Sequence, residues 1–182
     1  MICTLPFLGE RHYLQGTTLL ECLLPHAGNP VRFSFKIEKA ILSNTVEVTG
    51  DNGEHSAVLS FGDNALFVRE RPLILPVQRE EFDEQALTSR MDKEGECFIM
   101  LMEDSSPVRG MVAAFKHILL KYYPVPRRPG HWAFVRLDAA SFPQSASCLS
   151  LEKVFCRDGM ACCSVSFDNT FSATLYFAWA NF

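Results

Sequence analysis

The sequence lacks the short motifs that identify the best-known nucleotide-binding and metal-dependent enzymes. It contains no phosphate-binding loop of the form GxxxxGK[ST], no GxGxxG after a strand, no CxxC pair and no HExxH helix. Its adjacent Cys162 and Cys163 lie in a β-type run, where neighbouring side chains point to opposite faces and cannot easily share one metal ion. We therefore expect neither a metal nor another cofactor.

Long hydrophobic runs are also missing. The segment from Met111 to Leu120 is interrupted by Lys116 and His117, and it is shorter than the ~20 residues that cross a bilayer. The first residues, MICTLPFLGERHY, contain neither a basic beginning nor an apolar stretch long enough for a signal peptide. The sequence therefore predicts no membrane-spanning segment and a cytoplasmic protein.

Positive charge is not in excess, since the formal net charge is −4 and the pI is about 5.7. A nucleic-acid partner needs a basic face, so we do not expect one. What the sequence does have is 48% hydrophobic and 21% charged residues, which is typical of a packed globule. Its 182 residues suffice for one large domain or two small, fused ones.

The number of cysteines is odd, and several lie in apolar runs where a thiol behaves as a small hydrophobic group. The seven are Cys3, Cys22, Cys97, Cys148, Cys156, Cys162 and Cys163. We expect all of them to be reduced. Cys22 lies in an apolar helical pattern that would raise the pKa of its thiol, which argues against a nucleophilic role.

The first half of the chain has the pattern of one helix followed by several strands. Leucines recur near helical spacing over residues 13–24, with Gly16 close to the start and Pro25 at the end. β-type runs follow at residues 31–42, 45–49, 56–61 and 65–69. The turn-forming letters SN, GDNG and GDN separate them, so we predict an antiparallel meander.

The second half repeats this order after a charged segment. Residues 76–95 predict a crossover linker with a short helix near residues 83–92, which separates a first half, residues 1–75, from a second half, residues 96–182. A strand at residues 97–102, the turn EDSSP and a strong helix at residues 108–122 come next. Further strands are predicted at residues 131–137, 148–156, 160–167 and 170–179, with RDG and DN as turns.

The two halves also match in their letters. IEKAI at residues 37–41 parallels LEKVF at residues 151–155, and SAVLSF at residues 56–61 parallels SATLYF at residues 172–177. Gly16 at the start of the first helix has a counterpart in Gly110 at the start of the second. Chance similarity between alternating strands is one explanation. We favour an internal duplication, which gives an α+β protein of two related halves, each a helix packed on an antiparallel sheet.

This arrangement resembles the hot-dog fold, and the chain is similar in pattern to the superfamily of hot-dog thioester dehydratases and thioesterases. GTTLLE, from Gly16 to Glu21, looks like the helix start of 3-hydroxyacyl-thioester dehydratases, in which an acid follows a glycine by five residues. Leu24-Pro25-His26 looks like another element of that family and implies a different alignment. The chain departs from the family because no HFPG-like stretch precedes either helix and Phe115 stands where the second acid would be.

The resemblance implies a double hot dog with a site at a helix N-terminus. Unsatisfied amides at Gly16 or Gly110 would polarise a thioester carbonyl, and Glu21, with His12 as its partner, would move a proton. The alternatives are that the glycines only permit close packing, and that Glu21 and His12 are solvated surface residues.

Arg127 and Arg128, between prolines in PVPRRPG, form the most distinctive surface segment. Guanidinium groups suit phosphate, so this loop could bind the phosphate of coenzyme A or of an acyl carrier protein, or it could be an ordinary solvated loop. The resulting hypothesis is a protein that acts on or binds an acyl thioester, with dehydration, a lyase reaction, favoured over hydrolysis. A non-catalytic scaffold is the rival, and homo-oligomerisation stays open.

Overall fold

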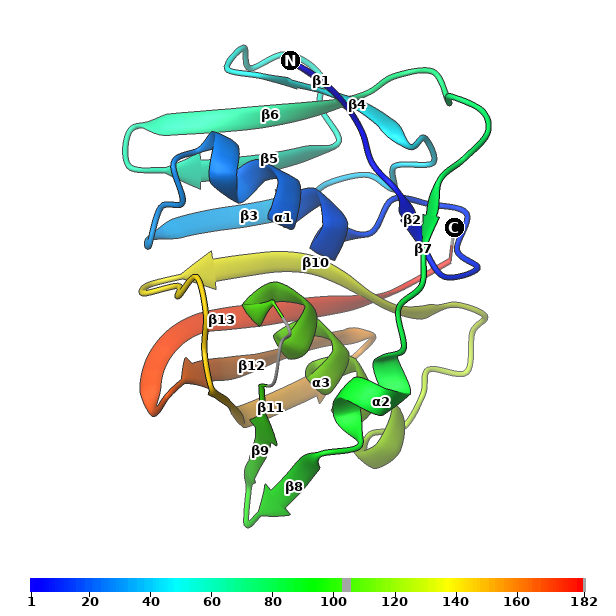
Figure 1. The fold of residues 1–182 in the computed structure, drawn as a ribbon. Coiled ribbons are helices and arrows are strands. Elements are labelled where there is room, and N and C mark those ends of the chain that lie inside the picture. Colours follow the sequence, from blue (N-terminus) through cyan, green and yellow to red (C-terminus); the bar gives the residue numbers. More distant parts are fainter. Residues whose placement is uncertain (103–105, 182) are drawn as a thin grey trace. The chain divides into compact units, whose positions relative to one another are not determined.

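The computed structural model describes residues 1–102 and 106–181, and the chain divides into two units, Met1–Phe82 and Asp83–Phe182. The division falls inside the predicted crossover at residues 76–95. Residues 103–105, in the predicted turn EDSSP, lie outside the described residues. Each unit has a main helix that lies across one face of its antiparallel strands (Figure 1).

The first unit contains one main helix and a sheet with the strand order β1-β4-β6-β5-β3. A short parallel pair, β2 with β7, lies outside this sheet. The elements are β1 (Ile2–Thr4), β2 (Phe7–Leu8), α1 (Gly16–His26), β3 (Phe33–Ile37), β4 (Thr45–Thr49), β5 (Ala57–Phe61), β6 (Asn64–Glu70) and β7 (Arg79–Glu80).

Helix α1 buries a leucine face against this sheet. Leu19, Leu20 and Leu23 are almost inaccessible to solvent, and the spacing of three and four residues puts them on one side of the helix. The helix does not end at Pro25 as predicted but continues to His26. Proline tolerates the helical φ, and the last turn closes with the hydrogen bond from Ala27 N to Leu23 O at 3.0 Å, which does not use the amide that Pro25 lacks.

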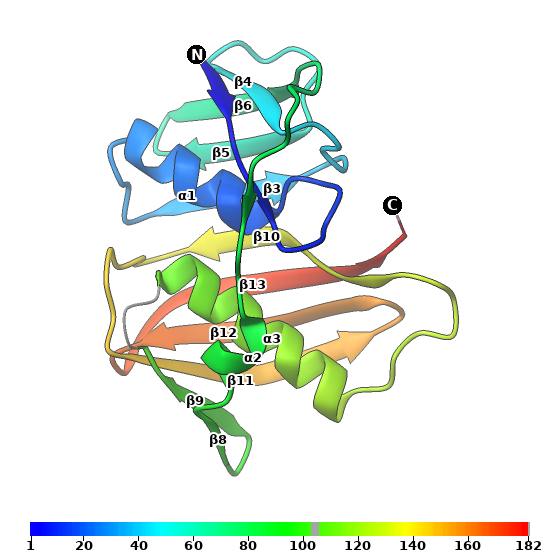
Figure 2. The same cartoon turned by 45° about the vertical axis from the view of Figure 1, so that its right-hand side comes forward.

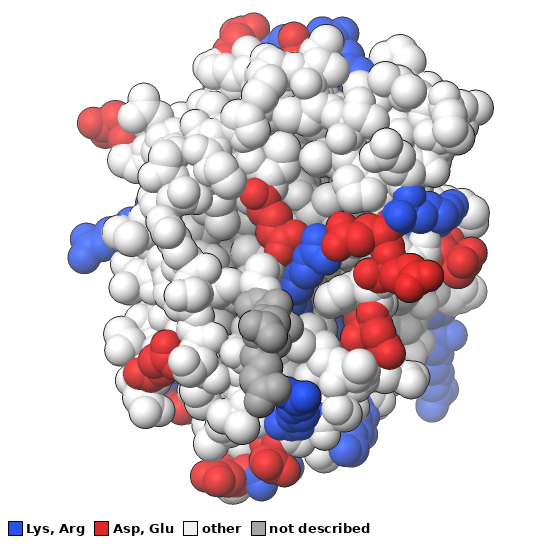
Figure 3. All heavy atoms as spheres, in the orientation of Figure 1, with Lys and Arg blue, Asp and Glu red and all other residues white. Residues whose placement is uncertain are grey.

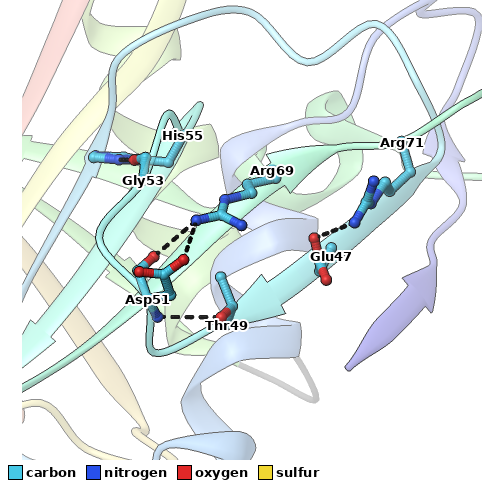
Figure 4. A network of polar contacts seen from close by, with 7 residues as sticks. All are labelled: Glu47, Thr49, Asp51, Gly53, His55, Arg69 and Arg71. Atoms are coloured by element: carbon cyan, nitrogen blue, oxygen red, sulfur yellow. Dashed lines mark hydrogen bonds and ion pairs between the residues drawn. The ribbon is translucent and has the colours of Figure 1, made fainter.

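The predicted meander of the first unit is wrong. Strand β6 pairs with both β4 and β5, so the connection at residues 50–56 has to pass β6 to reach β5. Arg69 of β6 holds this connection, because its Nη2 donates to Asp51 O at 3.2 Å and forms an ion pair with Asp51 Oδ2 at 2.9 Å (Figure 4). Gly53 lies directly against the guanidinium, where a Cβ would overlap Arg69 Nη2.

The second unit has the strand order β10-β13-β12-β11-β9-β8. Its helix α3 lies across the long strands (Figure 2), and the short helix α2 contacts α3. The elements are α2 (Glu84–Thr88), β8 (Met91–Glu94), β9 (Cys97–Leu101), α3 (Pro107–Tyr122), β10 (His131–Ala139), β11 (Cys148–Arg157), β12 (Met160–Phe167) and β13 (Thr170–Ala180).

The core of the second unit is aromatic. Phe115 of α3 meets Phe177 of β13 edge to face at 5.2 Å between ring centroids, and Phe177 in turn packs against Phe134 of β10 at 6.1 Å. Such pairs contribute about 0.5–1.5 kcal/mol beyond the area that they bury. Contacts between apolar aromatic rings therefore hold helix α3 on its sheet.

The internal duplication is visible in one repeated hydrogen-bond pattern. Ser56 O accepts from Glu38 N at 2.8 Å and Lys39 N at 3.1 Å, and Ser172 O accepts from Ala140 N at 2.8 Å and Ser141 N at 3.1 Å. The letter match of residues 56–61 with 172–177 therefore identifies equivalent strands. The match of residues 37–41 with 151–155 does not, because the end of β3 corresponds to the end of β10 and not to β11.

Candidate functional site

The segment before α1 is held in place by backbone hydrogen bonds and one arginine. Leu14 N donates to Ile41 O at 2.8 Å. Arg79 Nη1, from β7, donates to Gly9 O at 2.7 Å and to Arg11 O at 2.9 Å. These contacts fix the backbone that leads into α1, so the helix starts at a defined position.

The N-terminus of α1 is buried but has no side-chain cap among the residues that the structure describes. The residue at the N-cap is Gln15, and Gly16, the first helical residue, is buried. The Gln15 amide instead accepts from Arg11 Nε at 2.5 Å and donates to Thr17 Oγ1 at 3.2 Å. The first turn carries no acidic residue and lies near a guanidinium, so this terminus favours an electron-rich oxygen.

Thr18 is the unexpected residue of this helix start. Its side chain is buried, at 6% relative exposure, and its Oγ1 has no hydrogen-bond partner among the described residues. A buried hydroxyl without a partner costs about 1–3 kcal/mol, so this position is maintained at a cost in stability. Glu21 follows Thr18 by three residues and Thr17 by four, and it is half-buried on the same face of the helix.

The other residues predicted for the site lie in different surroundings. His12 is exposed in the bend before α1. The structure thus places Gly16 and Glu21 on one helix, with His12 in the segment that precedes it. Gly110, Arg127 and Arg128 belong to the second unit.

Gly110 does not open its helix, which corrects the prediction. Helix α3 begins at Pro107, and Ser106 caps it by accepting a hydrogen bond from Arg109 N at 3.1 Å. Gly110 N donates within the helix to Ser106 O at 2.9 Å, so this amide is already satisfied. A Cβ at Gly110 would overlap the thioether of Met102, which shows that this glycine permits close packing.

The arginine loop is attached to the end of β13. Arg128 O accepts from Trp179 Nε1 at 3.0 Å, and Arg128 Nη2 donates to Trp179 O at 3.4 Å. Gly130 permits this approach, since its φ is +149° and a Cβ would lie 2.6 Å from Ala180 O. Both arginines are exposed, and the loop is anchored through Arg128.

Charge is mixed on the face drawn in Figure 3, where acidic and basic side chains lie side by side. Among the described residues, no helix is both long and apolar enough to span a membrane. The same residues contain no group of three His, Cys, Asp or Glu side chains that could hold a metal ion.

The chain is similar to solved structures over most of its length. A TesB protein of Mycobacterium avium subsp. paratuberculosis has a TM-score of 0.53 and 11% identity, over 99% of this chain and 92% of that one. A protein described as an oleoyl thioesterase from Lactobacillus plantarum has a TM-score of 0.47 and 11% identity, over 100% and 96%. The erythromycin dehydratase has a TM-score of 0.48 and 8% identity, over 93% and 82%.

No protein-family model and no curated protein matches the sequence. The sequence analysis named Gly16 and Glu21 as candidates, which stay predictions, and it named neither Thr18 nor the Ser106 cap. The sequence does contain a signal for this difference, namely the residue before each helix, because Ser is a preferred N-cap and Gln is not. The order of the elements, the repeated helix-on-sheet unit and the match along almost the whole chain agree, and the chain therefore has the hot-dog fold, twice in one polypeptide.

Proposed function

We propose that the first unit binds the carbonyl group of an acyl thioester at the N-terminus of α1. The observation that carries the proposal is the buried Thr18 hydroxyl beside a buried helix start, where the described residues supply neither a partner for the hydroxyl nor a side-chain cap. The thioester would be that of coenzyme A or of an acyl carrier protein. Its oxygen would accept from the free amides of the first turn and from Thr18 Oγ1, which together polarise the carbonyl.

Glu21 is the group that we propose to move a proton. It follows Thr18 by three residues on the same helix, so we place the carbon next to a carbonyl bound at the helix start beside it. In the dehydration of a 3-hydroxyacyl thioester, its carboxylate takes the proton from that carbon, the double bond forms as the C–O bond breaks, and the hydroxyl leaves as water with a proton donated by protonated His12. His12 is the proposed second proton carrier, because it belongs to the segment that leads into α1.

A pair of threonine variants tests binding. Thr18→Val removes the hydroxyl and keeps the shape of the side chain, so the ligand-free protein should keep or slightly raise its melting temperature. Its affinity for acyl-coenzyme A, measured by calorimetry or thermal shift, should fall about tenfold, the loss of one hydrogen bond of ~1.4 kcal/mol. Thr17→Val is the matched control, because its hydroxyl is bonded to Gln15 and its loss should destabilise the free protein.

Glu21→Gln tests catalysis separately from binding. The change keeps the size of the side chain, so affinity should persist while the rate falls by ~10²–10⁴-fold. If no acyl thioester shifts the melting curve of the wild-type protein, the proposal is wrong.

The non-catalytic scaffold has one observation in its favour. The helix start of the second unit is capped by Ser106, and the residue at the place of Glu21, six residues after the N-cap, is the apolar Val112. We therefore propose no carbonyl-binding site at the start of α3. If Thr18→Val strengthened the free protein and no ligand bound, the first unit would be a scaffold as well.

A further inference from the structure

Two cysteines of the first unit lie in contact although they are far apart in its fold. Cys3 belongs to the N-terminal strand β1 and Cys22 to helix α1, and their Sγ atoms are 3.8 Å apart. Both side chains are half-buried, and both are free thiols in this structure. The remaining cysteines belong to the second unit, so this is the pair that joins a strand to the helix of the proposed site.

The surroundings hold both residues at this contact. Cys3 pairs with Val46 of β4 and points inward, since its neighbours Ile2 and Thr4 are exposed. Cys22 lies in the second half of α1, where His26 Nδ1 hydrogen-bonds to its carbonyl oxygen at 2.7 Å. A disulfide bond needs the sulfur atoms to approach by about 1.8 Å more, which rotation of two short side chains can provide.

We propose that Cys3 and Cys22 form a redox-responsive dithiol that closes to a disulfide when it meets a low-molecular-weight disulfide. The Cys3 thiolate attacks one sulfur of oxidised glutathione, a Cys3–glutathione bond forms, and one glutathione thiolate leaves. Cys22 then loses its proton to solvent and attacks Cys3 Sγ, which releases the second glutathione. The protein is oxidised by two electrons, and one glutathione disulfide is reduced to two thiols.

The order of these steps follows from the surroundings of Cys22. Burial, together with the neighbouring Cys3, raises the pKa of the Cys22 thiol to about 12. Its thiolate is therefore scarce at neutral pH, and Cys22 reacts only once Cys3 has been activated as a mixed disulfide. The second step is intramolecular, so the contact at 3.8 Å compensates for the scarce thiolate.

The bond would tie an edge strand to the main helix. Strand β1 has three residues and pairs only with β4, through contacts that include Val48 N to Met1 O at 2.7 Å. Such a short terminal strand opens easily. A link to α1 closes a loop of about 20 residues and restricts that opening, so β1 becomes a covalent part of the unit.

The sequence permits a direct test. Trypsin cleaves after Arg11 and Arg32, so Cys3 and Cys22 leave on separate peptides, residues 1–11 and 12–32, each with one cysteine. The reduced protein is incubated with excess oxidised glutathione at pH 8, alkylated, digested without reductant and analysed by mass spectrometry. We expect the two peptides to be joined, the melting temperature to rise by several degrees, and exchange of the Val48 amide to slow. Dithiothreitol should reverse all three changes.

Two variants complete the test. Cys3→Ser should abolish both the joined peptides and the rise in melting temperature, whereas Cys97→Ser, in the second unit, should retain them. The proposal is overturned if peptides 1–11 and 12–32 are recovered separately while glutathione stays on Cys3, or if Cys3 joins another cysteine. It is also overturned if the joined protein melts no higher than the reduced one.

Discussion

The two helix starts of this chain have the same place in their units and opposite chemistry. At α1 the N-cap is Gln15, Gly16 is buried, and the Thr18 hydroxyl has no partner among the described residues. At α3 the N-cap is Ser106, which accepts from Arg109 N, and Pro107 occupies the first helical position. The start of α1 keeps backbone amide donors available. At the start of α3, Ser106 accepts from one amide and Pro107 has no amide hydrogen.

The difference teaches how a duplicated fold can divide its tasks. In both units one face of the main helix packs on the sheet, and in α1 the buried residues include the first three, Gly16, Thr17 and Thr18. In α3 the stretch after the cap is filled by Phe115, which is 0% exposed and meets Phe177. The second unit therefore gains core stability where the first keeps a polar position, and stability and the proposed site belong to different units.

The two units differ as well in how the chain connects equivalent strands. In the second unit, two-residue turns join β11 to β12 and β12 to β13, and Asp158, Gly159, Asp168 and Asn169 all have positive φ as such turns require. In the first unit the connection from β4 to β5 passes β6 and depends on Arg69 (Figure 4). The first unit thus relies on a polar contact where the second relies on local turns.

Placing an acid in the core-facing side of α3 should have the largest effect on the stability of the second unit. Phe115→Glu puts a carboxylate into an aromatic core without a partner, and we expect a loss of at least about 4 kcal/mol in the free energy of unfolding. Both tryptophans, Trp132 and Trp179, belong to this unit, so urea unfolding followed by tryptophan fluorescence reports on it directly. Unchanged stability would show that the second unit could have carried an acid.

Removing the arginine that holds the connection in the first unit should have the next largest effect. Arg69→Met deletes the bonds to Asp51 and should cost about 1–1.5 kcal/mol, because Asp51 is 77% exposed but the Arg69 side chain is only 29% exposed. The loss of stability is measured by hydrogen exchange of the amides in β5 and β6. Arg157→Met is the matched control, since the Arg157–Asp158 pair is 76% and 86% exposed and should contribute little. Equal effects would refute the special role of Arg69.

The helix cap gives a smaller effect. Ser106→Ala should destabilise the second unit by about 1 kcal/mol, whereas Ser106→Asp keeps an acceptor for Arg109 N and should preserve stability. Urea unfolding by tryptophan fluorescence distinguishes them. If both variants behaved like the wild-type protein, the cap would not explain why α3 differs from α1.

The smallest effect concerns pH. Burial, and next the charge of Lys121, lower the pKa of His117 on α3 below its ordinary value near 6.5. The folded state therefore disfavours the proton that the unfolded state binds, so this contribution is present above pH ~6.5 and is lost as pH falls towards the folded pKa. His117→Gln should flatten the loss of stability in that range. If the variant lost stability with falling pH just as the wild-type protein does, His117 would not be the group responsible.

Particular residues show what could be predicted. The helical spacing of the leucines predicted α1, and the turn letters DG and DN predicted the hairpins of the second unit. Both patterns depend on only a few neighbouring residues. The short strands β1, β7 and β8 carry no such signal, since two to four residues suffice only when a neighbouring strand is already present. The prediction that Gly110 begins the second helix was wrong, because a glycine in the sequence looks the same at a helix start and at a close helix–strand contact.

The site divides in the same way. Glu21 five residues after Gly16 was visible in the sequence, since spacing along a helix decides which face a side chain occupies. Whether a hydroxyl finds a partner depends on what the rest of the fold places around it, and no pattern of letters shows that Thr17 is bonded and Thr18 is not. The contact between Cys3 and Cys22 is of the same kind.

By itself, the sequence determined that this chain is an α+β protein, that it repeats a helix followed by antiparallel strands, and where most of those elements lie, because periodicity and turn chemistry are local. Only the tertiary structure decided the strand order of the first unit, the equivalence of Ser56 with Ser172, and the open start of α1 beside the closed start of α3. Those features arise from contacts between residues far apart in the chain, whose burial and hydrogen bonds depend on the completed fold.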